Sequence, residues 1–505
     1  MRALKPTAAI PPEHLAALSH EFRTPLNGVI GMARLLDATR LTAEQRAYVS
    51  ALMESGEHLL GLVNDVLDYA RLGAGRIELS EGVVQPEELL RSVCELLSPR
   101  AHEKGVEIGW AADAGLAPFF ADEGRLKQIL LNLAGNAVKF VETGGVLVLA
   151  EGGRDGRLRF TVSDTGPGVA PERRNTIFEA FTQGSEGPAA QAGAGLGLAI
   201  ATRLAEAMGG ELGVAGELGR GADFWFEAAF RAAGAAKPQR SLGGRSVAVV
   251  SPSSIVREAA ARQIEASGGR AVRAETLPSA LALIGDGAVL LIDSLLGAEA
   301  GPPKERASVV LLKPEERDRI ALYRAAGFDG YLIKPLRRAS LVERVLAAVG
   351  EAPAAEDDRI AAPPRAKAPP MGEGVRVLLA EDNPVNAMLA RTLLRREGAQ
   401  VEHVADGDAA LAALARDEFD LILMDVRMPG LSGLEATQAL RARGVRTPVV
   451  ALTANAFDDD RRACIEAGMD DFLVKPLAPE ALRLVLARLA GPGWTHRRAS
   501  AKVAT

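Results

Sequence analysis

A chain of 505 residues is long enough for three or four domains of roughly 100 to 200 residues each, so one hydrophobic core does not account for it. Apolar residues make up 48% and charged residues 25% of the sequence, a globular composition that excludes a chain disordered throughout. The 59 Lys and Arg nearly balance the 65 Asp and Glu, and the net charge of −6 argues against binding to a nucleic-acid polymer or a membrane surface.

The cysteines and the apolar segments indicate the cellular compartment. Cys94 and Cys464 are far apart in the sequence, so we expect buried free thiols rather than a disulfide or a metal site. No segment reaches the ~18 to 20 apolar residues of a spanning helix, and the N-terminus lacks a signal-peptide pattern. We therefore expect a cytoplasmic protein without a membrane span.

Two segments rich in Ala, Pro and charged residues, 232–243 and 351–374, are predicted to be linkers because they cannot bury enough apolar surface to fold. With these linkers set aside, the sequence divides into a helical hairpin, an α/β domain, two further α/β domains and a tail. Their expected bounds are 1–80, 81–231, 244–350, 375–491 and 492–505.

Apolar residues recur at steps of three and four between Leu15 and Leu36, and again between Val49 and Ala70. This spacing predicts two helices that share a heptad seam. Thr42, followed by Gln45, matches a capping box at the start of the second helix. A hairpin with one exposed seam is expected to form a homodimer as a four-helix bundle.

Helical patterns alternate with strand patterns, such as 145–151 and 158–164, between residues 83 and 230, which predicts an α/β sandwich. The next two domains repeat one pattern. Residues 288–293 match residues 420–425, and Tyr-Leu-Ile-Lys-Pro at 331–335 matches Phe-Leu-Val-Lys-Pro at 472–476. The repeat predicts two doubly wound (βα)5 domains, whose functional residues lie at the carboxyl ends of the strands.

His20 lies on the first predicted helix, within Ser-His-Glu-Phe-Arg-Thr-Pro-Leu-Asn at 19–27. It is two positions from both Leu18 and Phe22, so its side chain should point away from the seam. An exposed imidazole nitrogen can act as a nucleophile, and Glu21 can accept the ring proton or orient the ring. By itself, this pattern also fits a solvated surface histidine.

Three polar residues, Asn132, Asn136 and Lys139, share one face of a predicted helix. An amide oxygen there can ligate Mg²⁺, and the ammonium can meet a phosphate group. A solvated helix face would have the same spacing.

Glycines mark two further segments of this domain. Asp164, Gly166 and Gly168 form an Asp-x-Gly-x-Gly turn after a strand, and the aromatic segment 177–181 includes Phe178. Bare backbone N–H groups at the start of a helix can bind phosphate oxygens. The glycines placed to supply them are Gly193, Gly195 and Gly197.

Together and in this order, these segments resemble the sensor histidine kinases from about residue 10 to 230. The resemblance implies that His20 is phosphorylated from ATP, that Glu21 is the assisting acid, and that Thr24 orients water in a reverse, phosphatase reaction. It further implies an ATP-binding domain at 81–231, in which Asp164 accepts a hydrogen bond from adenine and Asn136 is a Mg²⁺ ligand.

Acidic and polar residues end the predicted strands of the last domain: Glu381, Asp382, Asp425, Thr453 and Lys475. Clustered carboxylates suit Mg²⁺, which would let Asp425 attack a phosphoryl group while Lys475 and Thr453 neutralise its oxygens. The domain resembles a response-regulator receiver. The resemblance implies that Asp425 is the phosphoacceptor and that Arg427 supplies a backbone carbonyl to the metal.

The middle domain retains Asp293 and Lys334, but Ser251 and Pro252 stand at the positions of the acidic pair, and we place Lys313 at the hydroxyl position. Without the acidic pair a divalent ion loses its carboxylate ligands. We therefore interpret residues 244–350 as a pseudoreceiver that is not phosphorylated efficiently.

A pseudoreceiver can serve as a spacer or bind a ligand. Arg317 and Tyr331 are predicted on one face, where Arg can read a guanine edge and an aromatic ring can stack. This arrangement is similar to soluble hybrid kinases whose pseudoreceiver binds cyclic di-GMP. Both residues also fit ordinary roles, a solvated helix residue and the usual aromatic residue of a receiver.

The linker holds a charged cluster made of Asp357, Asp358 and Arg359. Most such clusters only aid solubility. Our hypothesis is a clamp in which the two carboxylates mimic the ligand's phosphates and keep the receiver away from His20 until the ligand displaces them.

These expectations describe a hybrid histidine kinase that passes phosphate from His20 to Asp425 and then to a histidine phosphotransfer protein or response regulator. Two alternatives remain, a nucleotide-switched scaffold without kinase activity and a non-kinase ATPase that shares the sandwich fold.

Overall fold

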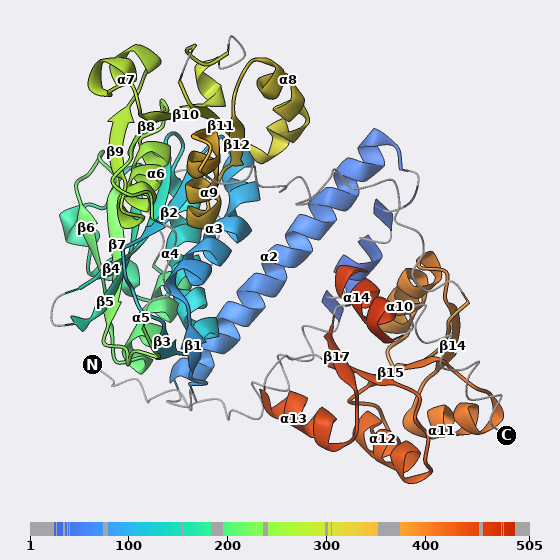
Figure 1. Cartoon of the computed structure of the whole chain (residues 1–505). Coiled ribbons are helices and arrows are strands. Elements are labelled where there is room, and N and C mark those ends of the chain that lie inside the picture. The colour runs from blue at the N-terminus through green and yellow to red at the C-terminus, as the bar shows by residue number, and fades with distance from the viewer. Residues whose placement is uncertain are drawn as a thin grey trace, which may run out of the picture. The chain divides into compact units, whose positions relative to one another are not determined.

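The computed structural model separates into two compact units, one built around residues 64–357 and the other around 16–63 and 358–505. Each unit is described by itself below (Figure 1). The residues that the structure describes are 25–26, 28–33, 36–37, 39, 41–73, 79–153, 156–182, 195–235, 241–297, 301–304, 306–351, 374–453, 458–475, 477 and 479–489.

Helix α2 (Ala43–Gly73) is the second helix of the predicted hairpin. Its capping box is present: the N–H of Gln45 donates to Thr42 Oγ1 at 3.2 Å, and the N–H of Thr42 donates to Gln45 Oε1 at 3.0 Å. A Cβ added at Gly56 would lie 2.8 Å from Ile30 Cγ1, so the two helices of the hairpin approach closely at this glycine.

The seam of α2 is only partly covered. Val49 is buried, whereas Leu52, Leu59 and Val66 are each about half exposed. These three residues follow one another at heptad spacing, so a single chain leaves an apolar ridge in water.

The predicted α/β sandwich is confirmed. Its five-stranded sheet has the order β2-β4-β5-β7-β6, in which β2 and β4 are parallel and the remaining pairs are antiparallel. Helices α3, α4 and α5 cover one face, and a large apolar core fills the space between helices and sheet. The strands are β2 (Glu107–Ala112), β4 (Gly145–Gly152), β5 (Leu158–Asp164), β6 (Glu211–Gly216) and β7 (Ala222–Ala228), the helices are α3 (Pro86–Glu103), α4 (Glu123–Phe140) and α5 (Gly197–Ala207), and a small sheet pairs β1 (Gly82–Val84) with β3 (Phe119–Ala121).

The predicted duplication is also confirmed. Both later domains are all-parallel five-stranded sheets with the doubly wound order 2-1-3-4-5, given by β9-β8-β10-β11-β12 and β14-β13-β15-β16-β17. The pseudoreceiver contains β8 (Ser246–Val250), α6 (Ser254–Ala266), β9 (Arg270–Ala274), α7 (Leu277–Leu283), β10 (Val289–Asp293), β11 (Ser308–Leu312), α8 (Ile320–Ala325), β12 (Gly330–Ile333) and α9 (Arg338–Ala348). The receiver contains β13 (Arg376–Ala380), α10 (Pro384–Arg396), β14 (Gln400–Val404), α11 (Gly407–Arg416), β15 (Leu421–Asp425), α12 (Gly433–Ala442), β16 (Val449–Thr453), α13 (Asp458–Glu466), β17 (Asp471–Val474) and α14 (Pro479–Leu489).

Strand register gives the equivalent positions of the two domains. Val250 pairs with Ile292 as Ala380 pairs with Met424, so Ser251 occupies the position of Glu381, as predicted. The assignment of Lys313 was wrong by one residue.

The correction follows from the fourth strand. Asp293 pairs with Leu311 as Asp425 pairs with Leu452, which places Leu312 at the position of Thr453. The apolar run of this strand is compatible with a shift of one residue when only the two sequences are compared. The conclusion is unchanged, because leucine also lacks the hydroxyl.

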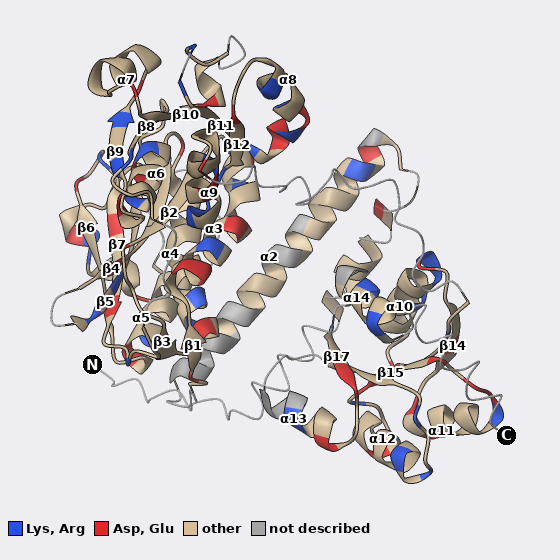
Figure 2. Cartoon of the chain, viewed as in Figure 1, with Lys and Arg blue, Asp and Glu red and all other residues tan. Residues whose placement is uncertain are grey.

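Cys94 and Cys464 are both buried and form no disulfide with each other, as expected. None of the helices in the described part of the chain is long and apolar enough to cross a membrane. Figure 2 shows basic and acidic positions interspersed along the described elements, in line with the small net charge.

Candidate functional site

The carboxyl edge of the receiver sheet brings the predicted acidic residues together. Ligand oxygens of Glu381, Asp382 and Asp425 all lie within 4.8 Å of one another. Lys475 Nζ lies 2.5 Å from both Asp425 Oδ2 and Glu381 Oε2. Three carboxylates provide the hard oxygen ligands that Mg²⁺ prefers, so the residues present fit this ion.

Hydrogen bonds from neighbouring groups hold Asp425 and Glu381 in place in this acidic site. The N–H of Arg427 donates to Asp425 Oδ1 at 3.1 Å, and Asn386 Nδ2 donates to Glu381 Oε1 at 2.9 Å. The sequence analysis did not predict Asn386 as a site residue, although its position on the first turn of α10, shortly after the acidic pair, could have indicated it. Thr453 is buried at the end of β16, at the same edge of the sheet.

Burial shifts the pKa of the two inner carboxyls. It raises the pKa of Asp425 and of Glu381 above their ordinary values, although Lys475 acts on both in the opposite direction. A site with three carboxylates and one lysine has net negative charge, so a divalent cation would relieve the repulsion between them.

In the sandwich domain, α4 and the start of α5 lie side by side. Asn132 Nδ2 donates to the carbonyl of Gly197 at 3.0 Å, which ties the amide-bearing face of α4 to the first turn of α5. Asn136 and Lys139 are half-buried on the same helix. Burial lowers the pKa of Lys139, and Arg100 adds to the effect.

Lys104, which sequence reasoning missed, closes the C-terminal end of α4. Its Nζ donates to the carbonyls of Val138, Lys139 and Val141 at 2.7, 2.8 and 2.9 Å. A cation that binds the last carbonyls of a helix also interacts favourably with the helix dipole. Lys104 therefore fixes the turn that carries Lys139.

The Asp-x-Gly-x-Gly turn lies at the end of β5. The N–H of Gly166 donates to Asp164 Oδ1 at 2.8 Å, and burial raises the pKa of Asp164. Gly168 has a φ of 72°, and a Cβ there would lie 2.3 Å from the carbonyl oxygen of Glu217. The turn therefore requires glycine at this position for steric reasons.

Phe178 and Phe181 differ in environment. Phe178, in the 3₁₀ helix Thr176–Phe178, packs against the core of the sandwich, whereas Phe181 is 66% exposed and has a φ of 63°. The N–H of Phe181 donates to the carbonyl of Gly195 at 3.0 Å, so the chain is pinned immediately before α5.

Several predicted site residues lie outside the described residues. They are His20, Glu21, Thr24, Gly193, Asp357, Asp358 and Arg359.

The pseudoreceiver retains a modified version of the acidic site. Ser251 Oγ donates to Asp293 Oδ2 at 2.6 Å, and Lys334 Nζ lies 3.3 Å from both oxygens of Asp293. The expectation that Lys334 holds Asp293 is confirmed. No metal-binding group of three acidic, His or Cys side chains is found here among the described residues.

Arg317 and Tyr331, which were predicted to lie on one face, have different surroundings. Arg317 is exposed on the 3₁₀ helix Pro314–Arg319. The guanidinium groups over the half-buried ring of Tyr331 belong to Arg344 and Arg324, at 5.0 and 5.8 Å from the ring centre. Nothing in the local sequence pairs these arginines with the tyrosine, because α8, β12 and α9 meet only in the fold.

These sites define a class of protein. Three families match: "His Kinase A (phospho-acceptor) domain" at residues 13–75, "Histidine kinase-, DNA gyrase B-, and HSP90-like ATPase" at 121–232, and "Response regulator receiver domain" at 377–487. The chain belongs to the hybrid histidine kinases, the family of proteins that combine these three domains.

Particular relatives extend over nearly the whole chain. A crystal structure of full-length ShkA in complex with AMPPNP is 61% identical, with a TM-score of 0.63, and covers 95% of this chain and 100% of that one. The ShkA first receiver in complex with c-di-GMP is 60% identical over 21% of this chain and 93% of that one, with a TM-score of 0.21. The sensor protein GacS of Pseudomonas syringae pv. syringae is 35% identical across 95% of this chain and 55% of its own length. This chain thus spans about half the length of the curated relatives it matches.

Proposed function

We propose that this protein phosphorylates His20 from ATP and relays the phosphoryl group to Asp425 of its own receiver. The observation that carries the proposal is the acidic site, in which Asp425 is buried beside Lys475 at 2.5 Å, in a chain that also has an ATP-binding domain. A scaffold or a simple ATPase would not need an intact phosphoacceptor site.

In this proposal each residue has a defined task. Asn132, Asn136 and Lys139 bind the nucleotide on α4, the N-terminus of α5 receives phosphate oxygens, and Asp164 meets the adenine base. In the receiver, Lys475 and Thr453 neutralise the oxygens of the transferred group while Asp425 attacks. Mg²⁺, held by Glu381, Asp382, Asp425 and the carbonyl of Arg427, would offset the negative charge that gathers during transfer.

The partners are part of the same proposal. The apolar ridge formed by Leu52, Leu59 and Val66 would be buried in a homodimer of hairpins. The acyl phosphate on Asp425 would next pass to a histidine phosphotransfer protein or a response regulator.

Labelling with γ-³²P-ATP tests the relay. His20→Ala should abolish all labelling, whereas Asp425→Ala should leave acid-labile label on His20. An Asp425→Ala protein that carries no histidine phosphate would show that the proposed direction of transfer is wrong.

We further propose that the pseudoreceiver binds cyclic di-GMP as a regulator. The first receiver of ShkA is described in complex with c-di-GMP, and the present chain is 61% identical to ShkA over nearly its full length. Tyr331, flanked by Arg324 and Arg344, offers a ring on which a guanine base can stack between cations. Arg317 would read a guanine edge at the rim of the same face.

The linker clamp formed by Asp357, Asp358 and Arg359 completes this proposal. If the two carboxylates occupy the ligand's surface, a double variant with Asp357→Asn and Asp358→Asn should relay phosphate to Asp425 without cyclic di-GMP. A double variant as inactive as the parent, and still dependent on the ligand, would exclude the clamp but not the ligand.

A further inference from the structure

Strand β2 of the ATP-binding domain is buried on both faces. Ile108, Trp110 and Ala112 alternate into the core of the sandwich. Their neighbours Glu107, Gly109 and Ala111 face the other way and are also buried. Since helices α3 to α5 all lie on the first side, another element must cover the second side of β2.

That element is α6 of the pseudoreceiver. Ala111, Leu147 and Leu149 of the ATP-binding domain form one apolar cluster with Ile255 and Ala259 of α6. A Cβ added at Gly109 would lie 2.8 Å from the Cβ of Ala259, so the strand and the helix are too close at this point for a residue larger than glycine. We call this contact, together with its polar border, the interdomain joint.

Polar groups extend the joint toward the remnant phosphorylation site. Gln263, fully buried on α6, donates to the carbonyl of Trp110 at 2.7 Å. Arg338, also buried, pairs with Glu87 at 2.8 Å and donates to the carbonyl of Ala112.

At the centre of this border, Lys334 contacts a residue of another domain. Its Nζ lies 2.8 Å from Glu107 Oε1 but 3.3 Å from the oxygens of Asp293. Lys334 is 2% exposed, Glu107 6% and Asp293 0%. Buried charges persist only when they are paired, so Glu107 needs this cation.

The receiver shows what Glu107 replaces. There, Lys475 lies between Asp425 and Glu381, the first member of the acidic pair. In the pseudoreceiver that position is Ser251, which cannot offer a charge, and the second carboxylate near the lysine comes from Glu107 instead. The two sites have the same lysine between two carboxylates, but one carboxylate belongs to the ATP-binding domain.

We propose that the remnant phosphorylation site of the pseudoreceiver serves as an ionic lock, in which Glu107 supplies the missing acidic partner of Lys334 and fixes the pseudoreceiver to the ATP-binding domain. The lock needs no phosphoryl group, because side chains of this chain supply both carboxylates around Lys334. The proposed lock does not depend on which ligand the pseudoreceiver binds.

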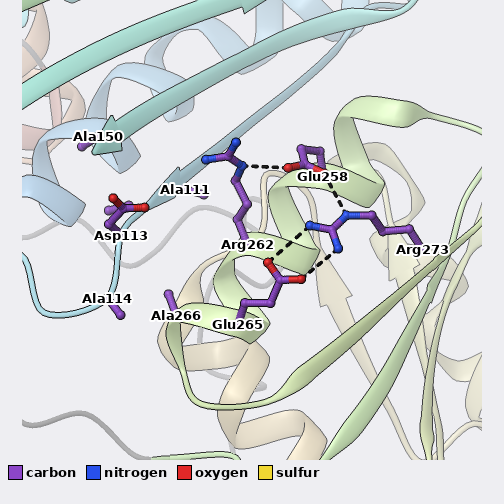
Figure 3. Close-up of a pocket in the computed structure, with 10 residues that line it drawn as sticks. Ala111, Asp113, Ala114, Ala150, Glu258, Arg262, Glu265, Ala266 and Arg273 are labelled. Atoms are coloured by element: carbon purple, nitrogen blue, oxygen red, sulfur yellow. Dashed lines mark hydrogen bonds and ion pairs between the residues drawn. The ribbon is translucent and has the colours of Figure 1, made fainter. Parts of the chain in front are cut away.

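A pocket of 570 Å³ lies at the margin of the joint and provides a place for a reporter (Figure 3). Its two arginines are already paired: Arg262 with Glu258, and Arg273 with Glu258 and Glu265. Ala111 lies at the edge of this pocket and is only 2% exposed, so a thiol introduced there is shielded while the joint is closed.

The test uses the full chain carrying A111C and measures the rate at which a maleimide dye labels the introduced thiol. E107M removes the carboxylate and retains the methylene groups. Because E107M removes a buried ion pair, labelling of the introduced thiol should become about tenfold faster or more. K334M leaves two carboxylates without a cation and should accelerate labelling at least as much. The matched control is E95M, which removes the more exposed interdomain pair of Glu95 with Arg337 at 2.8 Å.

Cys94 reports whether the ATP-binding domain itself remains folded, because it is fully buried in the core of that domain and burial raises its pKa. Faster labelling at the reporter in E107M, with Cys94 still protected and E95M near the parent rate, supports the lock. An unchanged rate in E107M, equal acceleration by E95M, or labelling of Cys94 at the accelerated rate would each overturn it.

Discussion

The ammonium of Lys475 lies 2.5 Å from the carboxylate of Asp425, whereas the equivalent Lys334 lies 3.3 Å from both oxygens of Asp293. The shorter contact occurs in the site that has three carboxylates, and the longer one in the site where a serine donates to the aspartate. The two domains have one topology, so a few side chains at the sheet edge separate a site that suits phosphoryl transfer from one that does not.

We predict that Asp425→Asn raises the melting temperature of the protein at neutral pH when Mg²⁺ is removed by EDTA. Burial raises the pKa of Asp425, so the folded state holds its proton more tightly than the unfolded chain does. The resulting stability is fully present below the unfolded pKa and is lost as the pH rises through the raised, folded pKa. An amide cannot ionise, so the advantage of the variant should vanish at low pH.

Mg²⁺ should reverse this order. At a hundredfold excess over its Kd, the ion should stabilise the parent by about 2.7 kcal/mol and Asp425→Asn much less. Glu466→Gln, which changes an exposed acid on α13, is the control and should behave like the parent. An equal effect of Mg²⁺ on parent and Asp425→Asn would exclude Asp425 as a ligand.

A second prediction is that Asp293→Asn leaves the phosphate relay nearly unchanged. Asp293 lacks the acidic pair, and its neighbours Ser251 and Lys334 already bind it. The rate of label transfer to the receiver, measured in single turnover beside Asp425→Asn, provides the check. Loss of relay in Asp293→Asn would mean that the pseudoreceiver takes part in the transfer.

Sequence reasoning succeeded where chemistry is local and failed where it is not. The capping box of Thr42 and Gln45 and the strand that ends at Asp425 follow from spacing within a few residues. Glu107 lies 227 residues before its partner Lys334, and no periodicity spans that separation. Arg344 lies only 13 residues after Tyr331, but the two residues are on different elements, α9 and β12, so no repeat within one element places them side by side.

The incorrect assignment of Lys313 to the hydroxyl position has a related cause. In a buried parallel strand every residue is apolar, so the sequence alone does not set the register, and only pairing across the sheet shows that Leu312 stands at the position of Thr453.

A third prediction concerns the end of α4. Lys104→Met should lower the stability of the ATP-binding domain by about 1 to 2 kcal/mol, since three carbonyls lose a charged donor. It should also weaken ATP binding, because the turn that carries Lys139 loosens. Urea denaturation and nucleotide titration measure the two effects, with Lys127→Met on the same helix as control. Weaker binding without any loss of stability would instead indicate direct contact between Lys104 and the nucleotide.

A fourth prediction is that Asn136→Asp weakens ATP binding about tenfold or more and removes labelling of His20. The substitution places a negative charge on the face of α4 that we assign to the triphosphate, where like charges repel. Gln128→Glu makes the same chemical change about two turns earlier on α4, next to Arg125, and should bind ATP normally. Equal losses in both variants would show that any charge on this helix is harmful and would leave Asn136 without a special role.

The last prediction addresses the ligand face of the pseudoreceiver. Base stacking on an aromatic ring contributes roughly 1 to 3 kcal/mol, so Tyr331→Ala should weaken cyclic di-GMP binding by about tenfold to hundredfold, whereas Tyr331→Phe keeps the ring and should bind nearly as well as the parent. Arg344→Ala should also reduce affinity, because Arg344 lies 5.0 Å from the ring centre and places a positive charge next to the stacking surface, where it can bind an anionic or acceptor group of the ligand.

Isothermal titration calorimetry on the full chain measures these affinities, and Arg270→Ala, an exposed arginine on β9, controls for the general loss of positive charge. Arg317→Ala separates the two accounts of this face. A loss equal to that of Arg344→Ala would support the proposed role of Arg317, while a normal affinity would limit the site to the arginines that contact the ring. If Tyr331→Phe loses as much affinity as Tyr331→Ala, the hydroxyl rather than the ring recognises the ligand, and stacking on Tyr331 is wrong.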